Sequence, residues 1–566
     1  MTQKTIWLTI AAAFLLSFLL GGVFGCADDD DDNDNDDDDN DDQSPADDDN
    51  ADDDNDTTID DDDDTSPPAF SCEELGLPVR EFVDAENSSA LYATAADLTL
   101  PTTAGDWNFK ENFTGCETYL FIQDLPRQCQ GWPIDLWARD VAPFLMALPA
   151  NVQVFYLSYE PDAPERQAEL DALKAQVDEY VNSLPAEEAA TWARRIHYVT
   201  EYAKDLPGWV GELMYSPKWG VGVDRFQRIR YIGSYADYNR FDSGMGWFAP
   251  NMKMAANEPV YYNFEAERED RLAAENATVV HVFDTEDWAS GTGYADVTLP
   301  DATTMATFDT LELDLYLGCV GDGEYGDCPA WDYIVNLYLC DEVDPDTCDV
   351  ELGRWITTYH REGRWVHDIS GILPLLAGGG QRRLAFFTSQ PYEVKLDLRF
   401  STQGKGVRPV SSTYLFSGGA FNPDYNTNYA PIEVAIPADA VQVQLATVIT
   451  GHGGVEPGNC AEFCNTEHHF VVNDTDNLRE FPEAGNSNGC MELVDEGTVP
   501  NQYGTWWYGR DGWCPGKEVQ MVMIDVTSQV TTGADNTFEY YAFYQGEPYP
   551  SEGANIVLTS WVVVYK

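Results

Sequence analysis

The feature that most constrains the fold is a change of periodicity near residue 276. Beyond this point, short runs alternate apolar and polar residues, at 311–317, 334–339, 394–400 and 441–445. Successive side chains of a strand point to opposite faces of its sheet, so this alternation indicates antiparallel strands with one buried face. We therefore predict an all-β half built as a double jelly roll, two eight-stranded antiparallel sandwiches over 276–410 and 411–566.

Residues 70–275 carry a different pattern. Short apolar runs alternate with apolar residues at helical spacing, in the order strand (119–122), helix (137–148), strand (152–159), helix (170–184), strand (196–199). This order predicts an α/β domain with a parallel sheet, and a late hairpin at 222–230 makes it similar to a thioredoxin-type fold. No Cys-x-x-Cys follows the first strand, where Cys129 stands alone, and thiol–disulfide exchange needs two sulfurs. We expect a scaffold or interaction domain that is not redox-active.

The first 26 residues predict export to a bacterial membrane. Lys4 precedes an apolar run over 6–24, and the run is followed by Gly25-Cys26. This is the pattern of a lipoprotein signal peptide with a lipobox, in which Cys26 becomes the lipid-modified first residue. A plain transmembrane anchor is the alternative, but it needs about 20 apolar residues and two adjacent glycines interrupt the run. We expect a lipid-anchored protein on the periplasmic face or at the cell surface.

The segment 27–69 is almost entirely Asp and Asn. Its 24 aspartates are accompanied by no aromatic and no basic residue, so it cannot bury the apolar surface that would offset the entropy of folding. We expect a disordered, self-repelling stalk. Without these aspartates the formal charge of −68 falls only to −44. A surface this acidic repels nucleic acid, which we exclude as a partner.

Twelve cysteines in a chain expected to be exported indicate disulfides rather than thiolate metal sites. Eight of them follow residue 300 as four close pairs, namely Cys319/Cys328, Cys340/Cys348, Cys460/Cys464 and Cys490/Cys514. Cys72, Cys116 and Cys129 lie earlier, so one of these three is expected to be unpaired or to bridge domains.

Two of the close pairs hold side chains suited to a polar, ring-shaped ligand. A disulfide between Cys460 and Cys464 would fix the backbone around Glu462, and the loop that ends near Cys514 supplies Arg510 and Trp513. A carboxylate, a guanidinium and an aromatic face on tethered loops favour a site for sugars. Two structural disulfides with incidental neighbours are the alternative.

Several motifs together resemble the peptide-N-glycosidase F family over roughly residues 276–566. They are Cys328-Pro329-Ala330-Trp331-Asp332, Gly353-Arg354-Trp355-Ile356-Thr357, Ile449-Thr450-Gly451-His452-Gly453, Cys460-Ala461-Glu462-Phe463-Cys464 and Gly512-Trp513-Cys514-Pro515-Gly516. The resemblance implies a bacterial amidase that removes N-linked glycans from asparagine, with its site in the groove between two jelly rolls. The substrate would be an N-glycosylated protein or glycopeptide. We expect a monomer with no cofactor and no metal site.

The resemblance also implies roles for individual residues. Asp332 falls on the principal catalytic aspartate, Glu462 on a glutamate that contacts sugar and water, and Arg510 on the arginine beside the aspartate. The residues expected to contact the substrate are Trp331, Trp513 and His452. Amide hydrolysis needs a base to activate water and an acid for the leaving amine, and we expect the cation to keep Asp332 ionised for that work.

The family pattern is incomplete in this chain. Tyr333 stands where the family has an arginine, and a further family glutamate aligns with 387–390, where no acid stands although Glu393 is near. One alternative is therefore a catalytically impaired glycan-binding or adhesive surface lipoprotein on the same scaffold. Another is a copper-dependent monooxygenase-like protein, suggested by Glu467-His468-His469, although adjacent histidines on a strand point to opposite faces.

Overall fold

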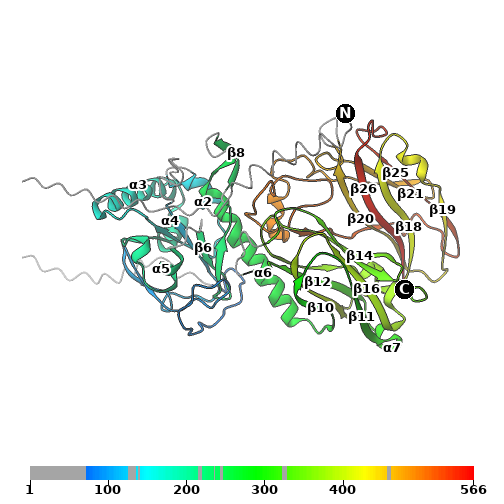
Figure 1. Ribbon diagram of the computed structural model, residues 1–566, viewed down its shortest axis with the longest axis horizontal. Coiled ribbons are helices and arrows are strands. Elements are labelled where there is room, and N and C mark those ends of the chain that lie inside the picture. Colours follow the sequence, from blue (N-terminus) through cyan, green and yellow to red (C-terminus); the bar gives the residue numbers. More distant parts are fainter. Residues whose placement is uncertain are drawn as a thin grey trace, which may run out of the picture.

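The computed structural model describes residues 72–124, 136–137, 140–214, 220–234, 236–242, 247–321, 328–454 and 460–566. The expected signal peptide, the stalk and Cys129 lie outside these residues. Figure 1 shows an N-terminal unit (residues 72–274) whose last helix, α6, leads into a larger region of packed sheets. None of the helices in the described ranges combines the length and the apolar character needed to cross a membrane.

The N-terminal unit is built on a five-stranded mixed sheet of order β5-β4-β3-β6-β7. Its strands are β3 (Thr118–Gln123), β4 (Val152–Leu157), β5 (Ile196–Tyr198), β6 (Gly220–Val223) and β7 (Ile229–Ile232). The first three are parallel, and β6 and β7 form the hairpin expected from the sequence. The strands also match the apolar runs in position. The closer likeness to a thioredoxin-type fold stays a prediction.

Both faces of this sheet are covered, which explains why β3 and β4 are buried along their whole length. One face packs on residues of α2 (Val141–Ala147), α3 (Ala163–Val181) and α4 (Ala186–Arg195). The other face packs on α5 (Gly208–Met214) and on the segment that contains Trp107 and Phe109. The smaller elements of the unit are β1 (Thr99–Thr102), β2 (Gly105–Asn108), η2 (Ala203–Asp205), β8 (Ala236–Asp242), β9 (Trp247–Pro250) and η3 (Met252–Ala256).

The sequence pattern does not predict α6 (Asn257–Ala274), the 18-residue helix that ends the unit. Pro259 lies in its first turn, where a missing N–H is tolerated, and its buried residues include Glu258 and Arg268 as well as Tyr261. Charged side chains are buried here because α6 packs against another polar surface. In Figure 1 it lies between the N-terminal sheet and the strands β10 (Thr278–Trp288) and β12 (Thr310–Gly318).

The first sandwich has the strand order of a jelly roll. One sheet is β10 (Thr278–Trp288), β17 (Tyr392–Ser401), β12 (Thr310–Gly318) and β15 (Gly363–Asp368), in that spatial order. The other is β11 (Gly291–Asp301), β16 (Gly379–Thr388), β13 (Ile334–Cys340), β14 (Cys348–Ile356) and β23 (Lys517–Glu518). The roll also contains α7 (Ala302–Met305) and, at the turn expected near 373–377, η4 (Ser370–Leu376).

The second sandwich repeats this order with eight strands. Its sheets are β18 (Pro409–Phe421), β26 (Ala554–Tyr565), β20 (Gln442–Gly453) and β24 (Val522–Asp525), and β19 (Ile432–Ile436), β25 (Ala534–Phe543), β21 (Glu467–Val472) and β22 (Thr475–Arg479). The short helices η5 (Tyr425–Asn428) and η6 (Met491–Glu496) lie in its loops. The expected double jelly roll is therefore present, although β23 comes from the later range and pairs with β14 of the first sandwich.

A buried polar seam fixes the two sandwiches against each other. Arg354 on β14 pairs with Glu351 at 2.7 Å and donates to Thr450 Oγ1 and to the carbonyl of Val557, both at 2.8 Å. Thr559 donates to the same glutamate. A buried ion pair needs such further hydrogen bonds to offset desolvation, so these contacts specify one arrangement of the rolls.

Five disulfides occur in the described residues. All four close pairs expected from the sequence are bonded, and the fifth bond joins Cys72 to Cys116 in the N-terminal unit.

Candidate active site

Asp332 lies in the segment that leads from the Cys319–Cys328 disulfide into β13. Thr357 holds the backbone on both sides of it: its hydroxyl donates to the Trp331 carbonyl at 2.6 Å and accepts from the Tyr333 N–H at 2.8 Å. The Asp332 side chain is 16% exposed. Its two neighbours are open to solvent, with Trp331 46% and Tyr333 41% exposed. The aspartate is thus recessed between two exposed aromatic side chains.

Arg510 approaches Asp332 from a loop of the second sandwich. Its buried guanidinium donates through Nη1 to the carbonyls of Thr505 and Tyr508, at 3.1 and 2.7 Å. Through Nη2 it donates to the Thr505 hydroxyl at 3.1 Å, the Tyr359 hydroxyl at 3.2 Å and Asp332 Oδ2 at 3.3 Å. These hydrogen bonds together hold the planar guanidinium of Arg510 in one orientation.

Glu462 completes the cluster from the short loop closed by the Cys460–Cys464 disulfide. Its Oε1 lies 4.0 Å from Arg510 Nε, and its Oε2 accepts from the Gly453 N–H at 3.2 Å. Within the described residues Arg510 Nε makes no hydrogen bond. The structure therefore brings Asp332, Glu462 and Arg510 together, one from the first sandwich and two from the second, around a guanidinium that is itself buried.

Two residues expected to contact a sugar form the wall behind Arg510. Trp513 is only 6% exposed, donates to the Gly451 carbonyl at 2.7 Å, and packs its ring 4.9 Å from the Arg510 guanidinium. The His452 ring stacks on it at 5.2 Å and contacts Thr450 Oγ1 at 2.8 Å. Burial, aided by Arg354, lowers the pKa of His452 to about 3, so the ring is neutral.

The acidity of Asp332 differs from the sequence-based expectation. Burial raises the pKa of the Asp332 carboxyl above its ordinary value, although the Arg510 charge and the Tyr359 hydroxyl oppose the rise. Burial likewise raises the pKa of Glu462 against the Arg510 charge, and the charge of Asp332 adds to that rise. Arg510 therefore favours the ionised form of Asp332 as expected, but desolvation outweighs this attraction and the net shift of the pKa is upward.

Sequence reasoning missed Tyr359 and Thr505, the two side chains that position Arg510 beside Asp332. Tyr359 follows the Gly353–Thr357 motif by two residues, which is the one sequence signal that could have drawn attention to it. Glu393, near the place of the absent family glutamate, pairs with Lys395 at 3.0 Å.

The adjacent histidines considered for copper have separate partners. His468 is fully buried and contacts Thr466 Oγ1 at 2.8 Å and the Tyr540 hydroxyl at 2.9 Å. His469 contacts Asp476 at 2.7 Å. Across the part of the chain that the structure describes, no three His, Cys, Asp or Glu side chains are grouped as metal ligands.

Fold and site together define a double jelly roll with two carboxylates and an arginine where the rolls meet. The family model described as peptide-N-glycosidase F, C terminal, matches residues 421–563. The chain is 25% identical over 305 residues to peptide-N(4)-(N-acetyl-β-D-glucosaminyl)asparagine amidase F of Elizabethkingia miricola, covering 48% of this chain and 81% of the relative. These two matches relate the C-terminal half of the chain to the peptide-N-glycosidase F family.

Solved structures are similar to the same half. Recombinant PNGase F is 20% identical with a TM-score of 0.40, covering 51% of this chain and 96% of that one. PNGase F described as a glycosylasparaginase from Flavobacterium meningosepticum is 18% identical with the same TM-score and coverage. PNGF-II is 15% identical with a TM-score of 0.39, covering 53% of this chain and 66% of that one.

Proposed function

We propose that this protein hydrolyses the amide bond between asparagine and N-acetylglucosamine in N-glycosylated proteins or glycopeptides. The observation that carries the proposal is the convergence of Asp332, Arg510 and Glu462 at the junction of the two rolls. Each of the three lies in the half of the chain that is related to the peptide-N-glycosidase F family, and the name of the amidase relative describes this reaction.

In this proposal Asp332 is the acid/base centre. Water adds to the amide carbonyl as Asp332 accepts a proton, and that proton passes to the departing glycosylamine nitrogen as the C–N bond breaks. The products are an aspartate in the peptide and a glycosylamine, which loses ammonia in water. A carboxyl whose pKa is raised toward the working pH serves well in both transfers.

The neighbouring side chains have distinct roles in the proposal. Arg510 is already fixed by Tyr359 and Thr505, so its charge can stabilise the oxygen that becomes negative without reorganising. The Glu462 carboxylate lies beside this guanidinium with 23% of its side chain exposed, and it suits the polar groups of the sugar. Trp331, with nearly half of its surface exposed, offers a flat apolar face to the pyranose ring.

Glycan release tests the reaction. The full-length chain is incubated with a denatured N-glycoprotein and with a glycopeptide, and released glycans are labelled with a fluorophore and separated. We expect release by the wild type and none by Asp332→Asn. The matched control is Asp296→Asn, an exposed aspartate on β11 of the same sandwich, which should retain activity. If the wild type and Asp332→Asn release equal amounts, or neither releases any, the proposal fails.

A second candidate is a glycan-binding surface protein without catalysis. The exposed Trp331 and Tyr333 favour it, since they flank the recessed aspartate and would bind sugar rings whether or not hydrolysis follows. Retention of glycopeptide on the immobilised wild type, with no released glycan and equal retention by Asp332→Asn, would select this candidate.

We further propose that the chain is exported as a monomeric lipoprotein anchored through Cys26. The support is the sequence pattern of residues 1–26 alone. Metabolic labelling with a radioactive fatty acid should mark the wild type and not Cys26→Ser, and light scattering of the detergent-solubilised protein should give the mass of one chain.

A further inference from the structure

Two loops place an aromatic pair beside the candidate active site, His360 on loop 357–362 and Tyr503 on loop 499–505. The two rings meet edge to face, with their centroids 5.2 Å apart. Tyr503 has 40% of its surface exposed, and yet burial raises the pKa of its hydroxyl. A ring that is open to solvent while the surrounding protein desolvates its hydroxyl lies in a concave part of the surface. The pair therefore lines a groove.

This aromatic pair lies next to Asp332. The N–H of His360 donates to the Pro329 carbonyl at 3.0 Å, so the loop of His360 runs along the segment that carries the aspartate. The residue before it, Tyr359, contacts Arg510 Nη2, which is also the nitrogen that contacts Asp332. The aromatic pair and Asp332 thus share one end of the guanidinium.

The other end of the guanidinium faces the group expected to contact the sugar. Glu462 lies 4.0 Å from Arg510 Nε, whereas Asp332 and the Thr505 hydroxyl lie at Nη2. If the sugar lies at Glu462 and the scissile amide at Asp332, the substrate continues away from Glu462. Its asparagine and the attached peptide then reach the two loops at the Nη2 end.

The backbone that carries Tyr503 is fixed on both sides of it. Gln502 is fully buried, accepts from the Tyr359 N–H at 2.8 Å, and donates to two backbone carbonyls at 2.7 and 2.9 Å. Gly504 has a φ of +77°, and a Cβ there would lie 2.9 Å from the Tyr359 ring. A side chain held on such a backbone loses little freedom when it binds a ligand.

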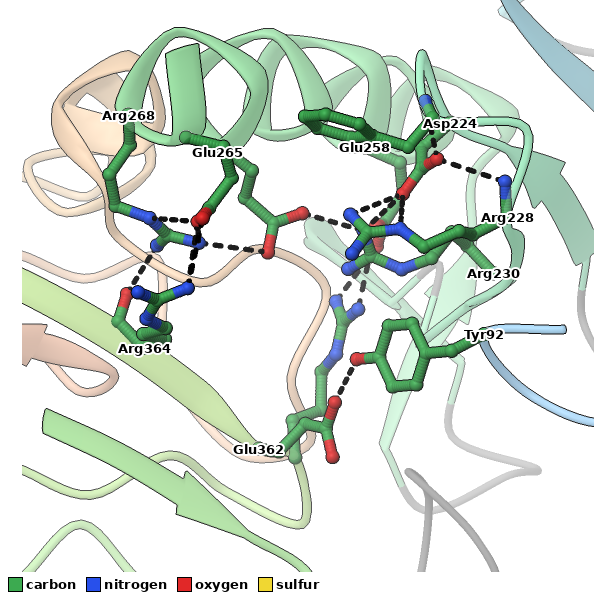
Figure 2. Close-up of polar contacts among 12 residues, drawn as sticks. Tyr92, Asp224, Arg228, Arg230, Glu258, Glu265, Arg268, Glu362 and Arg364 are labelled. Carbon is green, nitrogen blue, oxygen red and sulfur yellow. Dashed lines mark hydrogen bonds and ion pairs between the residues drawn. The ribbon is translucent and has the colours of Figure 1, made fainter. Parts of the chain in front are cut away.

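The loop that carries His360 is fixed as well. His360 has a φ of +59°, in the left-handed region that residues other than glycine rarely adopt. Such strained conformations persist where the surrounding structure maintains them, and they are concentrated at active sites and ligand clamps. Figure 2 shows the end of this loop, where Glu362 contacts the Tyr92 hydroxyl of the N-terminal unit. The N-terminal unit therefore helps to hold one wall of the groove.

We propose that Tyr503 and His360 form a subsite for the peptide part of the substrate, next to the glycosylated asparagine. The inference rests on the proposed function, which sets where the sugar and the asparagine lie, and it adds the side chains that recognise the polypeptide. Tyrosine suits this role, because its ring packs on an extended peptide while its hydroxyl bonds to a polar group. The aromatic pair takes no part in bond cleavage.

Two substrates with the same glycan test the subsite. One is a glycopeptide with several residues on each side of the asparagine, and the other is the glycosylated asparagine blocked by acetyl and methylamide groups. We expect the wild type to give the higher kcat/KM with the glycopeptide. Tyr503→Ala should lower the ratio of the two values about tenfold, mainly through the KM for the glycopeptide.

The controls separate a peptide contact from a structural role. Tyr503→Phe keeps the ring and should keep most of the ratio. Tyr414→Ala is the matched control, because Tyr414 is 51% exposed on β18, outside both loops, and it should not change the ratio. A ratio that Tyr503→Ala leaves unchanged overturns the inference even if activity falls, since a structural role or a sugar contact would lower both values equally.

Binding to Asp332→Asn separates this inference from the amidase proposal. Fluorescence anisotropy is measured with the labelled glycopeptide and with its free glycan. We expect the glycopeptide to bind at least about tenfold more tightly, and the further change Tyr503→Ala to remove most of this difference. If the wild type releases no glycan but the difference is present and depends on Tyr503, the amidase proposal fails and the subsite stands. Equal affinity for the two ligands, no binding of either, or a difference that survives Tyr503→Ala overturns the subsite.

Discussion

The ion pair between Glu258 on α6 and Arg361 should couple the N-terminal unit to the candidate active site. Both side chains are fully buried, and Arg361 Nη1 donates to Glu258 Oε1 at 2.8 Å. Asn501 donates to the same glutamate at 3.0 Å, and Arg361 also donates to the Pro500 carbonyl. The pair therefore joins α6 to two loops, 357–362 and 499–505.

Those loops carry Tyr359 and Thr505, which hold Arg510 in place. Glu258→Gln removes one charge of the pair and leaves the Arg361 guanidinium buried without its counter-charge, which costs about 3–5 kcal/mol. If this free energy is lost only from the closed state of the two loops, their equilibrium constant for local opening rises about a hundredfold to a few thousandfold. We expect glycan release to fall as Arg510 loses its fixed orientation.

Native-state hydrogen exchange measures this opening. The informative amides are that of Ser234, which donates to the Asn501 carbonyl at 2.7 Å, and that of Tyr359, which donates to Gln502 Oε1 at 2.8 Å. Glu267→Gln is the control, because Glu267 is exposed on the same helix and such changes alter stability by no more than about 0.5 kcal/mol. Equal exchange at both amides in the two variants, with equal turnover, would refute the coupling.

Three further changes test other parts of the structure. Burial raises the pKa of Asp511 to about 8, so the folded state keeps a proton that the unfolded state releases near pH 4. The free energy of unfolding should then fall by up to about 1.4 kcal/mol per pH unit from about pH 4 to about pH 8. Asp511→Asn should flatten this slope, measured from denaturant midpoints at several pH values. An unchanged slope contradicts the raised pKa of Asp511. Gly497 has a φ of +104°, and a Cβ there would lie 2.6 Å from the Phe264 ring. Gly497→Ala should therefore lower the stability measured in thermal melts by about 1–3 kcal/mol. Gly419→Ala is the control, because the space around Gly419 is open. Replacing Cys460 and Cys464 by serine should lower stability by about 2 kcal/mol, because the unfolded chain gains entropy when the loop is no longer closed. Glycan release should fall even at temperatures where the variant stays folded, because Glu462 on that loop loses its position.

How much of the fold the sequence predicts is clear from β12. Alternation correctly identifies Leu311, Leu313, Leu315 and Leu317 as core residues, all at most 1% exposed. The opposite face, with Glu312 and Asp314, looks like a solvated face, yet both acids are less than 10% exposed because α6 covers them through Arg271 and the Arg364 network. An alternating pattern identifies the polar face of a strand, but it does not show whether water or a charged helix contacts that face.

The candidate site shows a similar division. The motifs predict Asp332, Glu462 and Arg510, because each lies in or beside a cysteine-rich stretch with its own local pattern. Tyr359 and Thr505 could not be predicted, since their role depends on two loops meeting in space. The direction of the Asp332 pKa shift could not be predicted from the sequence either, because it depends on whether the effect of burial exceeds that of the Arg510 charge.

The connection between α6 and β10 has a consequence for proteolysis. Only residues 275–277 separate the end of the helix from the first strand of the sandwich, and Glu275 itself pairs with Arg399 at 3.0 Å. A protease that cuts this link would break one peptide bond and leave the Glu258, Glu269 and Arg271 contacts across the boundary intact. The nicked protein should therefore migrate as two fragments in denaturing gels and as one particle in native ones.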